Sequence, residues 1–528
     1  MKEVIFGNVI RDLRKSQQMS QEEFAESLNV SKQAVQKWEN GASIPDISHL
    51  LLIHEKFGIS LDRLFFGASE NNVQAIRFLP VNPDYATRSF WDEYSQNLLI
   101  DYRQSTEEGK DIAAYKSLIE CVDGLPNGNA KHDMSDIIYR LIADAPERDG
   151  YLFVEPSDYD GIVALSNAKT DSKPLNVDKN KLEGAFTGRI VGCLLGKPVE
   201  GVTREGIRAI LRASDNYPIK RYITTNDIIP EVPFSDCYCV DRVEEYPFPD
   251  DDIDYTVLAQ RVVDKYGADF TAENVIATWC DLVPRNVFCT AERVAFKNYT
   301  DGYMPPYTAM HQNAFREWIG AQIRADYYGY ICPGDPFTAA AMAFRDASVS
   351  HTINGIYGSM YVAALIAVAA RTSNMEEAIG EALQYIPTTS RMYKAINGVL
   401  KDYSGGVTEQ KCFDKIFAEY DDSDVHCWLH VICNAMIVTA ALLYGNKDFT
   451  RTLSLAVSAG YDTDCNGATC GSVLGMMCGV ECIAPSWTAV LHGGTRTDVR
   501  ASESVKITEF VQTAVKHANI INKEAKNK

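Results

Sequence analysis

The sequence predicts a mainly α-helical protein with more than one domain. Its 528 residues exceed what one hydrophobic core usually serves. Hydrophobic residues make up 46% of the chain and charged residues 23%, which is a globular composition. Apolar positions recur at helical spacing near the N-terminus, between residues 91 and 145, and in several later segments. We therefore expect an N-terminal five-helix domain (1–67), a helical spacer (68–178), a large all-α domain (179–515) and a basic tail (516–528).

The charge and the cysteines limit the classes of partner. A formal net charge of −20 opposes general affinity for polyanions or anionic membranes, so any DNA contact must come from a local face. The longest apolar run, residues 360–370, is too short to span a bilayer, and the amphipathic N-terminus lacks a secretory signal. Fourteen scattered cysteines without CxxC pairs indicate reduced thiols. These observations predict a cytoplasmic protein without membrane contact.

Residues 1–67 carry the start and stop signals of short helices. Ser20 begins "SQEEF", a capping box with Glu23 three residues later. Ser31 begins a second short helix, "SKQAVQKWENG", which stops at Gly41. The connection "LNVS" between the two helices has the length of the tight turn in a helix-turn-helix.

This segment resembles a Cro/repressor-type helix-turn-helix domain over nearly its full length. Such domains place the helix after the turn in the major groove, which predicts DNA contact by Lys32, Gln33, Gln36 and Lys37. Trp38 is expected in the core. The alternative is a helical protein–protein module, because residues 2–63 hold eight basic and nine acidic side chains. A nearly neutral domain predicts salt-sensitive binding as a homodimer on a palindromic operator.

The spacer, residues 68–178, shows no chemical motif. "GASENNVQ" is a polar exit from the first domain, and helical periodicity follows over residues 91–100, 111–122 and 134–145. "ALSNAKTDSKPLNVDKN" has the composition of a linker or surface loop.

The third region combines small residues with clustered carboxylates. In "GAFTGRIVGCLLGKPVEG" the glycines recur every four residues and leave one helix face without side chains, so this face must touch another backbone closely: Gly184, Gly188, Gly192 and Gly196. Glu200 follows the end of this helix.

Two acidic stretches lie in the same region. "FPDDDIDYT" places Asp250, Asp251 and Asp252 at a helix start, with Asp254 as a fourth carboxylate, which exceeds what capping requires. "GYDTDCNGATCGSVLG" places Asp462 and Asp464 two positions apart before another run of small residues. Close carboxylates repel each other unless a cation or proton is shared, and oxygen ligands without Cys/His sets favour hard divalent ions.

Residues 182–483 resemble the ADP-ribosylglycohydrolase family. "GRIVGCLLGKPVEG" corresponds to the family pattern GxxxGDALGxPxE with Cys193 in place of Asp, and residues 250–253 correspond to its TDDT motif. "GYDTDC" corresponds to the GGDTDT motif, with Cys465 in place of a metal-binding hydroxyl. The resemblance implies an all-α domain that binds two Mg²⁺ ions, with Mn²⁺ as a substitute, and hydrolyses a glycosidic bond at an ADP-ribosyl anomeric carbon.

The resemblance also implies roles for individual residues. The metal ligands would be Asp250, Asp251, Asp252, Asp462 and Asp464. The catalytic group would comprise Glu200, Asp251, Asp252 and Asp464. Arg324 is either a phosphate partner or half of a structural salt bridge, His351 is either near the ligand or structural, and Tyr461 is a further ligand-binding candidate. His430 is expected to be a core histidine.

Together these features predict a transcription regulator that carries a metal-dependent glycohydrolase domain. Its partners would be operator DNA and an ADP-ribosylated protein or ADP-ribose-like small molecule. The two thiols at motif positions leave a catalytically inactive ADP-ribose or nucleotide sensor as an alternative. An N-glycosidase acting on a nucleoside-like or sugar metabolite is a third possibility.

Overall fold

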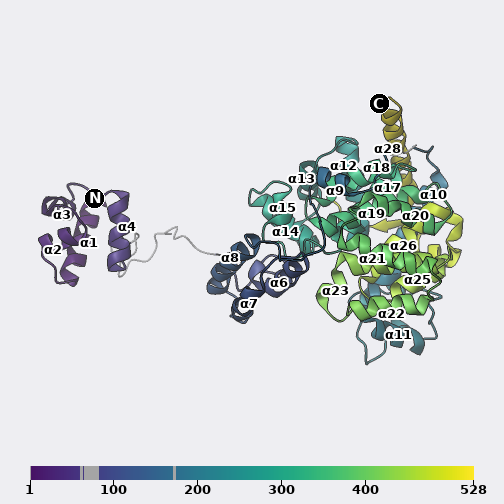
Figure 1. Cartoon of the computed structure of the whole chain (residues 1–528), viewed down its shortest axis with the longest axis horizontal. Coiled ribbons are helices and arrows are strands. Elements are labelled where there is room, and N and C mark those ends of the chain that lie inside the picture. Colours follow the sequence, from purple (N-terminus) through teal and green to yellow (C-terminus); the bar gives the residue numbers. More distant parts are fainter. Residues whose placement is uncertain (1, 60–62, 65–82, 171–173, 528) are drawn as a thin grey trace. The chain divides into compact units, whose positions relative to one another are not determined.

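The computed structural model describes residues 2–59, 63–64, 83–170 and 174–527 (Figure 1). The chain divides into two compact units, residues 1–83 and 84–528. Helices dominate both units, which confirms the mainly α fold class. The strands among the described residues are β1 (Gly494–Arg496) and β2 (Ser504–Lys506), which pair antiparallel with Thr495 opposite Val505.

The first unit consists of short helices around a small core. Its helices are α1 (Lys2–Ser16), α2 (Gln21–Ser27), α3 (Lys32–Glu39) and α4 (Ile47–Phe57). Ser20 and Glu23 form the capping box at the start of α2, and Ser31 caps α3. Trp38 is buried with Phe24 beneath these helices. Of the expected fifth helix only residues 63–64 are described, and the polar exit at 67–74 lies outside the described residues.

The region expected as a spacer folds as part of the second unit. Its helices are α6 (Leu98–Glu107), α7 (Lys116–Asp123), α8 (Asn129–Ala143) and α9 (Tyr159–Leu165); in Figure 1 the first three group below α14 and α15, and α9 lies apart from them. Residues 91–97 do not continue α6, although their periodicity is helical. The Asn97 amide donates to the carbonyls of Phe90 and Glu93 instead, and such local bonds compete with helix formation.

Four helices form the buried centre of the second unit: α10 (Lys179–Gly196), α19 (Ile353–Ala369), α24 (Val431–Tyr444) and α26 (Thr463–Cys478). Nearly every residue of α19, α24 and α26 is buried. The other helices surround this centre: α11 (Arg204–Ala213), α12 (Asp251–Tyr266), α13 (Ala272–Leu282), α14 (Thr290–Thr300), α15 (Tyr307–Met310), α16 (Gly320–Ile323), α17 (Asp326–Ile331), α18 (Pro336–Ala347), α20 (Met375–Ala382), α21 (Arg391–Ser404), α22 (Glu409–Glu419), α23 (Val425–Leu429), α25 (Phe449–Ser458), α27 (Pro485–Thr488) and α28 (Ile507–Asn527).

Helices α10 and α26 meet backbone to backbone along two facing rows of glycine. A methyl group at Gly188 would overlap the carbonyl of Gly471, and one at Gly192 would overlap the carbonyl of Gly467. The contact continues to the end of α10, where a methyl group at Gly196 would overlap the backbone of Thr463 and Asp464. The sequence predicted such a contact for α10 from its four-residue glycine spacing. It brings the end of α10 against the start of α26.

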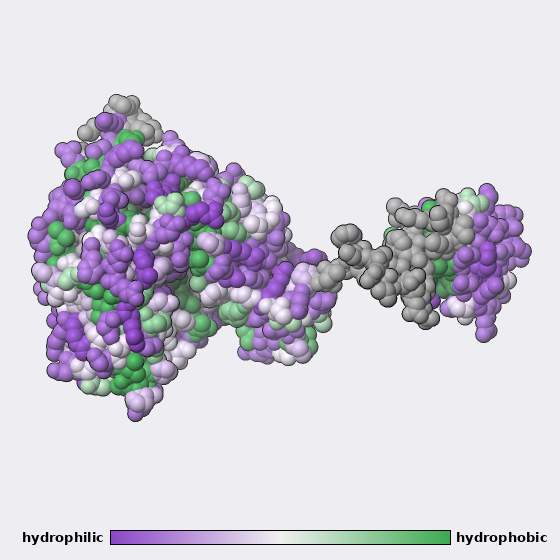
Figure 2. All heavy atoms as spheres, turned by 180° about the vertical axis from the view of Figure 1, so that it is seen from behind, coloured by the Kyte–Doolittle hydropathy of each residue, from purple (hydrophilic) through white to green (hydrophobic). Residues whose placement is uncertain are grey.

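The surface view agrees with a water-exposed exterior. In the face drawn in Figure 2, hydrophilic residues predominate and apolar side chains appear in scattered groups. Within the described ranges, no helix combines the length and apolar character needed to cross a bilayer.

All fourteen cysteines lie among the described residues and are free thiols.

We expect the glycine contact to tolerate no side chain. Gly471→Ala should lower the free energy of unfolding by about 1–3 kcal/mol or prevent folding, because its methyl group overlaps the Gly188 carbonyl. Gly398→Ala is the matched control: Gly398 lies in α21 with no atom near an added methyl group, so alanine should raise stability by about 0.5–1 kcal/mol. Thermal and urea unfolding measure both. Equal stability of the two variants would contradict a backbone contact between α10 and α26.

Candidate functional site

Three chain segments bring six carboxylates together at one end of the α10–α26 contact. Glu200 follows the 3-10 turn Lys197–Val199 at the end of α10, Asp250 caps the start of α12, and Asp462 occupies the N-cap position of α26. The Thr463 hydroxyl donates to the carbonyl of Gly196 (2.9 Å) and fixes the first segment to the third. The full set is Glu200, Asp250, Asp251, Asp252, Asp462 and Asp464.

The ammonium group of Lys197 lies within this cluster. Its Nζ is 2.8 Å from Glu200 Oε2, 2.8 Å from Asp250 Oδ2 and 3.1 Å from Asp464 Oδ2. The contact to Asp464 is a hydrogen bond, and those to Glu200 and Asp250 are ion pairs. No sequence motif indicated a role for Lys197. Its position after Gly196 shows that it lies at the end of the glycine-lined helix, but not which carboxylates it contacts.

A second buried cation reaches the cluster from inside α10. Arg189 donates to Asp252 Oδ1 (3.1 Å) and to Asp326 Oδ2 (2.8 Å), and all three side chains are fully buried. The guanidinium is shared between two carboxylates, so it neutralises Asp252 only in part. An arginine in the middle of an otherwise largely apolar helix is the sequence signal that could have indicated this ion pair. The Asp254 side chain instead accepts the backbone N–H of Asp498 (3.0 Å).

Burial and the repulsion between neighbouring charges raise the pKa of several carboxyl groups in this cluster. Burial raises the pKa of Glu200 to about 8, and the charge of Asp464 adds to the shift, while Lys197 offsets part of it. Burial likewise raises the pKa of Asp251 to about 7, and Asp250 adds to it. Asp464 behaves differently: burial would raise its pKa, but Lys197 and hydrogen bonds keep it below its ordinary value. The cluster therefore carries excess negative charge that only protons or cations can neutralise.

The cluster has the donor set of a divalent cation site. One ligand atom each from Asp252, Asp464 and Cys465 lies within 4.8 Å of the others, and Glu200, Asp462 and Asp464 form a second such group. Asp252 Oδ2 is buried and accepts no hydrogen bond from the described residues. A buried carboxylate oxygen that accepts no hydrogen bond is suited to bind a hard cation. Cys465 fits less well, since burial raises the pKa of its thiol and keeps it neutral.

A cavity of about 490 Å³ opens beside the carboxylates. Its wall includes Glu200, Asp251, Asp462, Asp464 and Cys465. Aromatic and apolar side chains complete the lining, among them Phe90, Trp91, Trp318, Trp428 and Leu429. The volume suits a small-molecule ligand, and the combination of many apolar groups with few polar ones is typical of ligand pockets.

The structure places the predicted ligand-binding residues away from this lining. Arg324 is fully buried and forms ion pairs with both Glu292 and Asp346, which favours the structural alternative. His351 contacts Ser350 (2.8 Å) and borders another cavity of about 460 Å³. The Tyr461 hydroxyl donates to the Tyr420 carbonyl (2.6 Å). None of the three is among the residues that line the carboxylate cavity.

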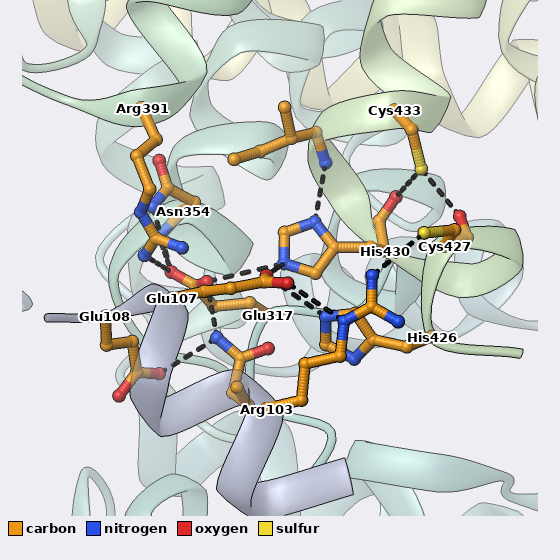
Figure 3. Close-up of polar contacts among 12 residues, drawn as sticks. Arg103, Glu107, Glu108, Glu317, Asn354, Arg391, His426, Cys427, His430 and Cys433 are labelled. Carbon is orange, nitrogen blue, oxygen red and sulfur yellow. Dashed lines mark hydrogen bonds and ion pairs between the residues drawn. The ribbon is translucent and has the colours of Figure 1, made fainter. Parts of the chain in front are cut away.

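A separate polar cluster joins α6 to α23 and α24 (Figure 3). Glu107, His426 and His430 offer ligand atoms within 4.8 Å of one another. However, His430 Nδ1 accepts the backbone N–H of Ile432 (3.2 Å), so the neutral ring carries its proton on Nε2, which faces Glu317 at 3.4 Å. A metal would need the lone pair at that Nε2. The cluster is therefore a buried hydrogen-bond network, and His430 lies in the interior as predicted.

The predicted DNA-reading residues share one exposed helix face. Lys32, Gln33, Gln36 and Lys37 are exposed on α3, whereas Val35 and Trp38 are buried on its opposite face. Lys32 also forms an exposed ion pair with Glu22 at 3.2 Å.

Comparison with known proteins agrees with both halves of this architecture. The family model for ADP-ribosylglycohydrolase matches residues 175–515. The chain belongs to the ADP-ribosylglycohydrolase family. A helix-turn-helix family model matches residues 10–64. This glycohydrolase family member therefore carries a helix-turn-helix ahead of its family domain.

Two relatives illustrate the two halves separately. Part of the chain is 36% identical over 62 residues to the HTH-type transcriptional activator BcrR of Enterococcus faecalis, covering 12% of this chain and 30% of that protein. The solved structure of an ADP-ribosylglycohydrolase-related protein complex matches 65% of this chain and 98% of its own at 18% identity, with a TM-score of 0.39.

The raised pKa values predict that cation binding displaces protons. Asp251 is partly protonated at neutral pH, and a divalent ion requires its charged form. Affinity for Mg²⁺ should therefore rise between about pH 6 and pH 8, with protons released on binding. Calorimetry in two buffers of different ionisation enthalpy measures the release, and Asp251→Asn should reduce it. Identical binding enthalpies in both buffers would contradict protonated carboxyls at the site.

Proposed function

We propose that this protein is a DNA-binding transcription regulator whose second unit hydrolyses a glycosidic bond at an ADP-ribosyl anomeric carbon, with Mg²⁺ as cofactor. The observation that carries the proposal is the convergence of six carboxylates from three distant segments, four of which line one cavity. Structural ion pairs do not explain this arrangement, because the six carboxylates outnumber the basic groups of Lys197 and Arg189 that reach them. Membership of the family supplies the reaction class.

The residues suit a reaction that builds positive charge on a sugar ring. Cleavage of a glycosidic bond passes through an oxocarbenium-like state, which nearby carboxylates stabilise. Glu200 lines the cavity and keeps a proton at neutral pH, so it can deliver that proton to a leaving group. The divalent ion would be held by Asp250, Asp251, Asp252, Asp462 and Asp464, and it would supply a grip on sugar hydroxyls and a more acidic water. Lys197 positions the carboxylates of Glu200 and Asp464 through direct ion pairs.

The first unit supplies the DNA contact in this proposal. Its support is the helix-turn-helix match and the exposure of four polar side chains on α3. Gln36 can pair bidentately with adenine, while Lys37 can contact phosphate. The nearly neutral unit favours a homodimer on a palindromic site, because two recognition helices compensate for weak electrostatic attraction.

A ligand sensor without turnover is the second candidate, and Lys197 is the observation that favours it. Its ammonium contacts three carboxylates that a divalent ion would otherwise bind. The thiols of Cys193 and Cys465 also stand at motif positions where harder ligands would bind such an ion more tightly. In this case the cavity would bind an ADP-ribose-like ligand and the site would lack a functional metal.

Hydrolysis assays separate the two candidates. The full chain with Mg²⁺ should release ADP-ribose from an ADP-ribosylated arginine peptide, and Asp464→Asn should lose more than about 100-fold in rate, since even outer-shell partners of a metal contribute 10–100-fold. Asp281→Asn, the same change at an exposed carboxylate outside the cavity, should have no effect. Binding of ADP-ribose without turnover, combined with tight metal uptake only in Lys197→Met, would favour the sensor.

DNA binding is tested on fragments that the full chain selects from a random library. Lys37→Ala should weaken binding to all selected sequences and lower the salt dependence by about one charge, as expected for a phosphate contact. Gln36→Ala should instead relax the preference at one base pair. Lys394→Ala, an exposed lysine of the second unit, is the control. Fluorescence anisotropy at several salt concentrations measures these changes, and equal affinity of the two α3 variants and the control would contradict a reading role for α3.

A further inference from the structure

The wall of the carboxylate cavity includes residues that lie outside the family domain. Ser89, Phe90 and Trp91 precede the matched region, which begins at residue 175, by more than eighty positions. They nevertheless line the same cavity as Asp251 and Asp464. They also belong to the segment with which the chain enters the second unit.

We propose that residues 89–91 form the part of the cavity that receives a planar aromatic group, such as a nucleobase, attached to the sugar. This inference rests on the proposed function, which places the sugar beside the carboxylates. It adds that residues 89–91 select the group attached to that sugar. Phe90 is the central contact residue of this wall. Ligand selection would then depend on a segment that the family domain does not contain.

The first support is the aromatic character of the wall. Phe90 and Trp91 share the cavity with Trp318 and Trp428. Phe90 remains 42% exposed, although its ring is large and apolar. Aromatic rings that line a cavity can stack on any base, because every base has a π-face.

The second support is a pair of unused hydrogen-bond donors. Trp318 Nε1 and Trp428 Nε1 are buried, and neither has an acceptor among the described residues. Both side chains line the cavity. A buried indole N–H normally finds an acceptor, and the ring nitrogens and carbonyl oxygens of a base are acceptors. Stacking surfaces together with free donors fit a base better than an aliphatic group.

The third support is that the segment is held in place. Asp92 forms ion pairs with Arg285 (2.5 Å) and Arg293 (2.8 Å), both from the family domain. The Asn97 amide donates to the Phe90 carbonyl (2.7 Å), which fixes the backbone at the contact residue. Arg293 also lies over the ring of Trp91, with its Cζ 5.9 Å from the ring centre. These contacts preorganise the wall before a ligand enters.

Binding of ADP-ribose to the full chain tests the inference. Isothermal titration calorimetry in Mg²⁺ should show that Phe90→Ala weakens binding about tenfold, the loss expected for one stacking contact, while Phe90→Tyr stays within about threefold of the unsubstituted chain. Leu99→Ala is the matched control, because Leu99 is a similarly exposed apolar residue of the same region and is absent from the cavity lining. Unchanged melting temperatures would show that the variants are folded.

Hydrogen exchange gives an independent readout. ADP-ribose should slow amide exchange in peptides that cover residues 84–97 of the unsubstituted chain. Wild-type affinity in Phe90→Ala, or no protection of residues 84–97, overturns the inference and leaves the proposed function standing. Failure of the unsubstituted chain to bind ADP-ribose at all overturns the ligand class of the proposed function, and this inference with it.

Discussion

The close contact between α10 and α26 is the constraint on which the rest of the second unit depends. Two glycine rows let the helix backbones touch, and side chains at Gly188 or Gly471 would force them apart. Because the contact extends to Gly196, it sets the end of α10 against the start of α26, where Asp462 and Asp464 lie. Lys197 and Glu200 follow α10 directly. The geometry of the site is thus fixed by backbone packing and not by the acidic residues themselves, whose mutual repulsion would drive them apart.

That repulsion explains why cations recur around the cluster. Lys197 contacts three of the carboxylates and Arg189 reaches Asp252 from within α10. These two groups leave most of the negative charge uncompensated. Burial, together with this remaining negative charge, raises the pKa values of Glu200 and Asp251. A divalent ion and a built-in ammonium are alternative ways to neutralise the same oxygens. In the proposed function, the balance between them would decide whether the family domain acts as an enzyme or as a sensor.

The sequence predicted the features that depend on local pattern. The capping residues Ser20 and Ser31 mark the starts of α2 and α3. The four-residue glycine spacing indicates a helix face without side chains. Features that depend on long-range packing could not be predicted from the sequence. A lysine after a helix gives no sign of which carboxylates it will meet, and the helical periodicity of residues 91–97 gave way to the ion pairs of Asp92 and the hydrogen bonds of Asn97. The placement of Phe90 beside a cavity built from residues 197–465 likewise depends on tertiary structure.

The carboxylates that backbone packing brings together should share a divalent cation. Anomalous diffraction from crystals of the full chain soaked in Mn²⁺ tests it most directly, because it locates the ion without relying on activity. The account predicts a manganese peak within coordination distance of Asp252 and Asp464. Absence of a peak at saturating Mn²⁺, or a peak only at sites away from these residues, would contradict it.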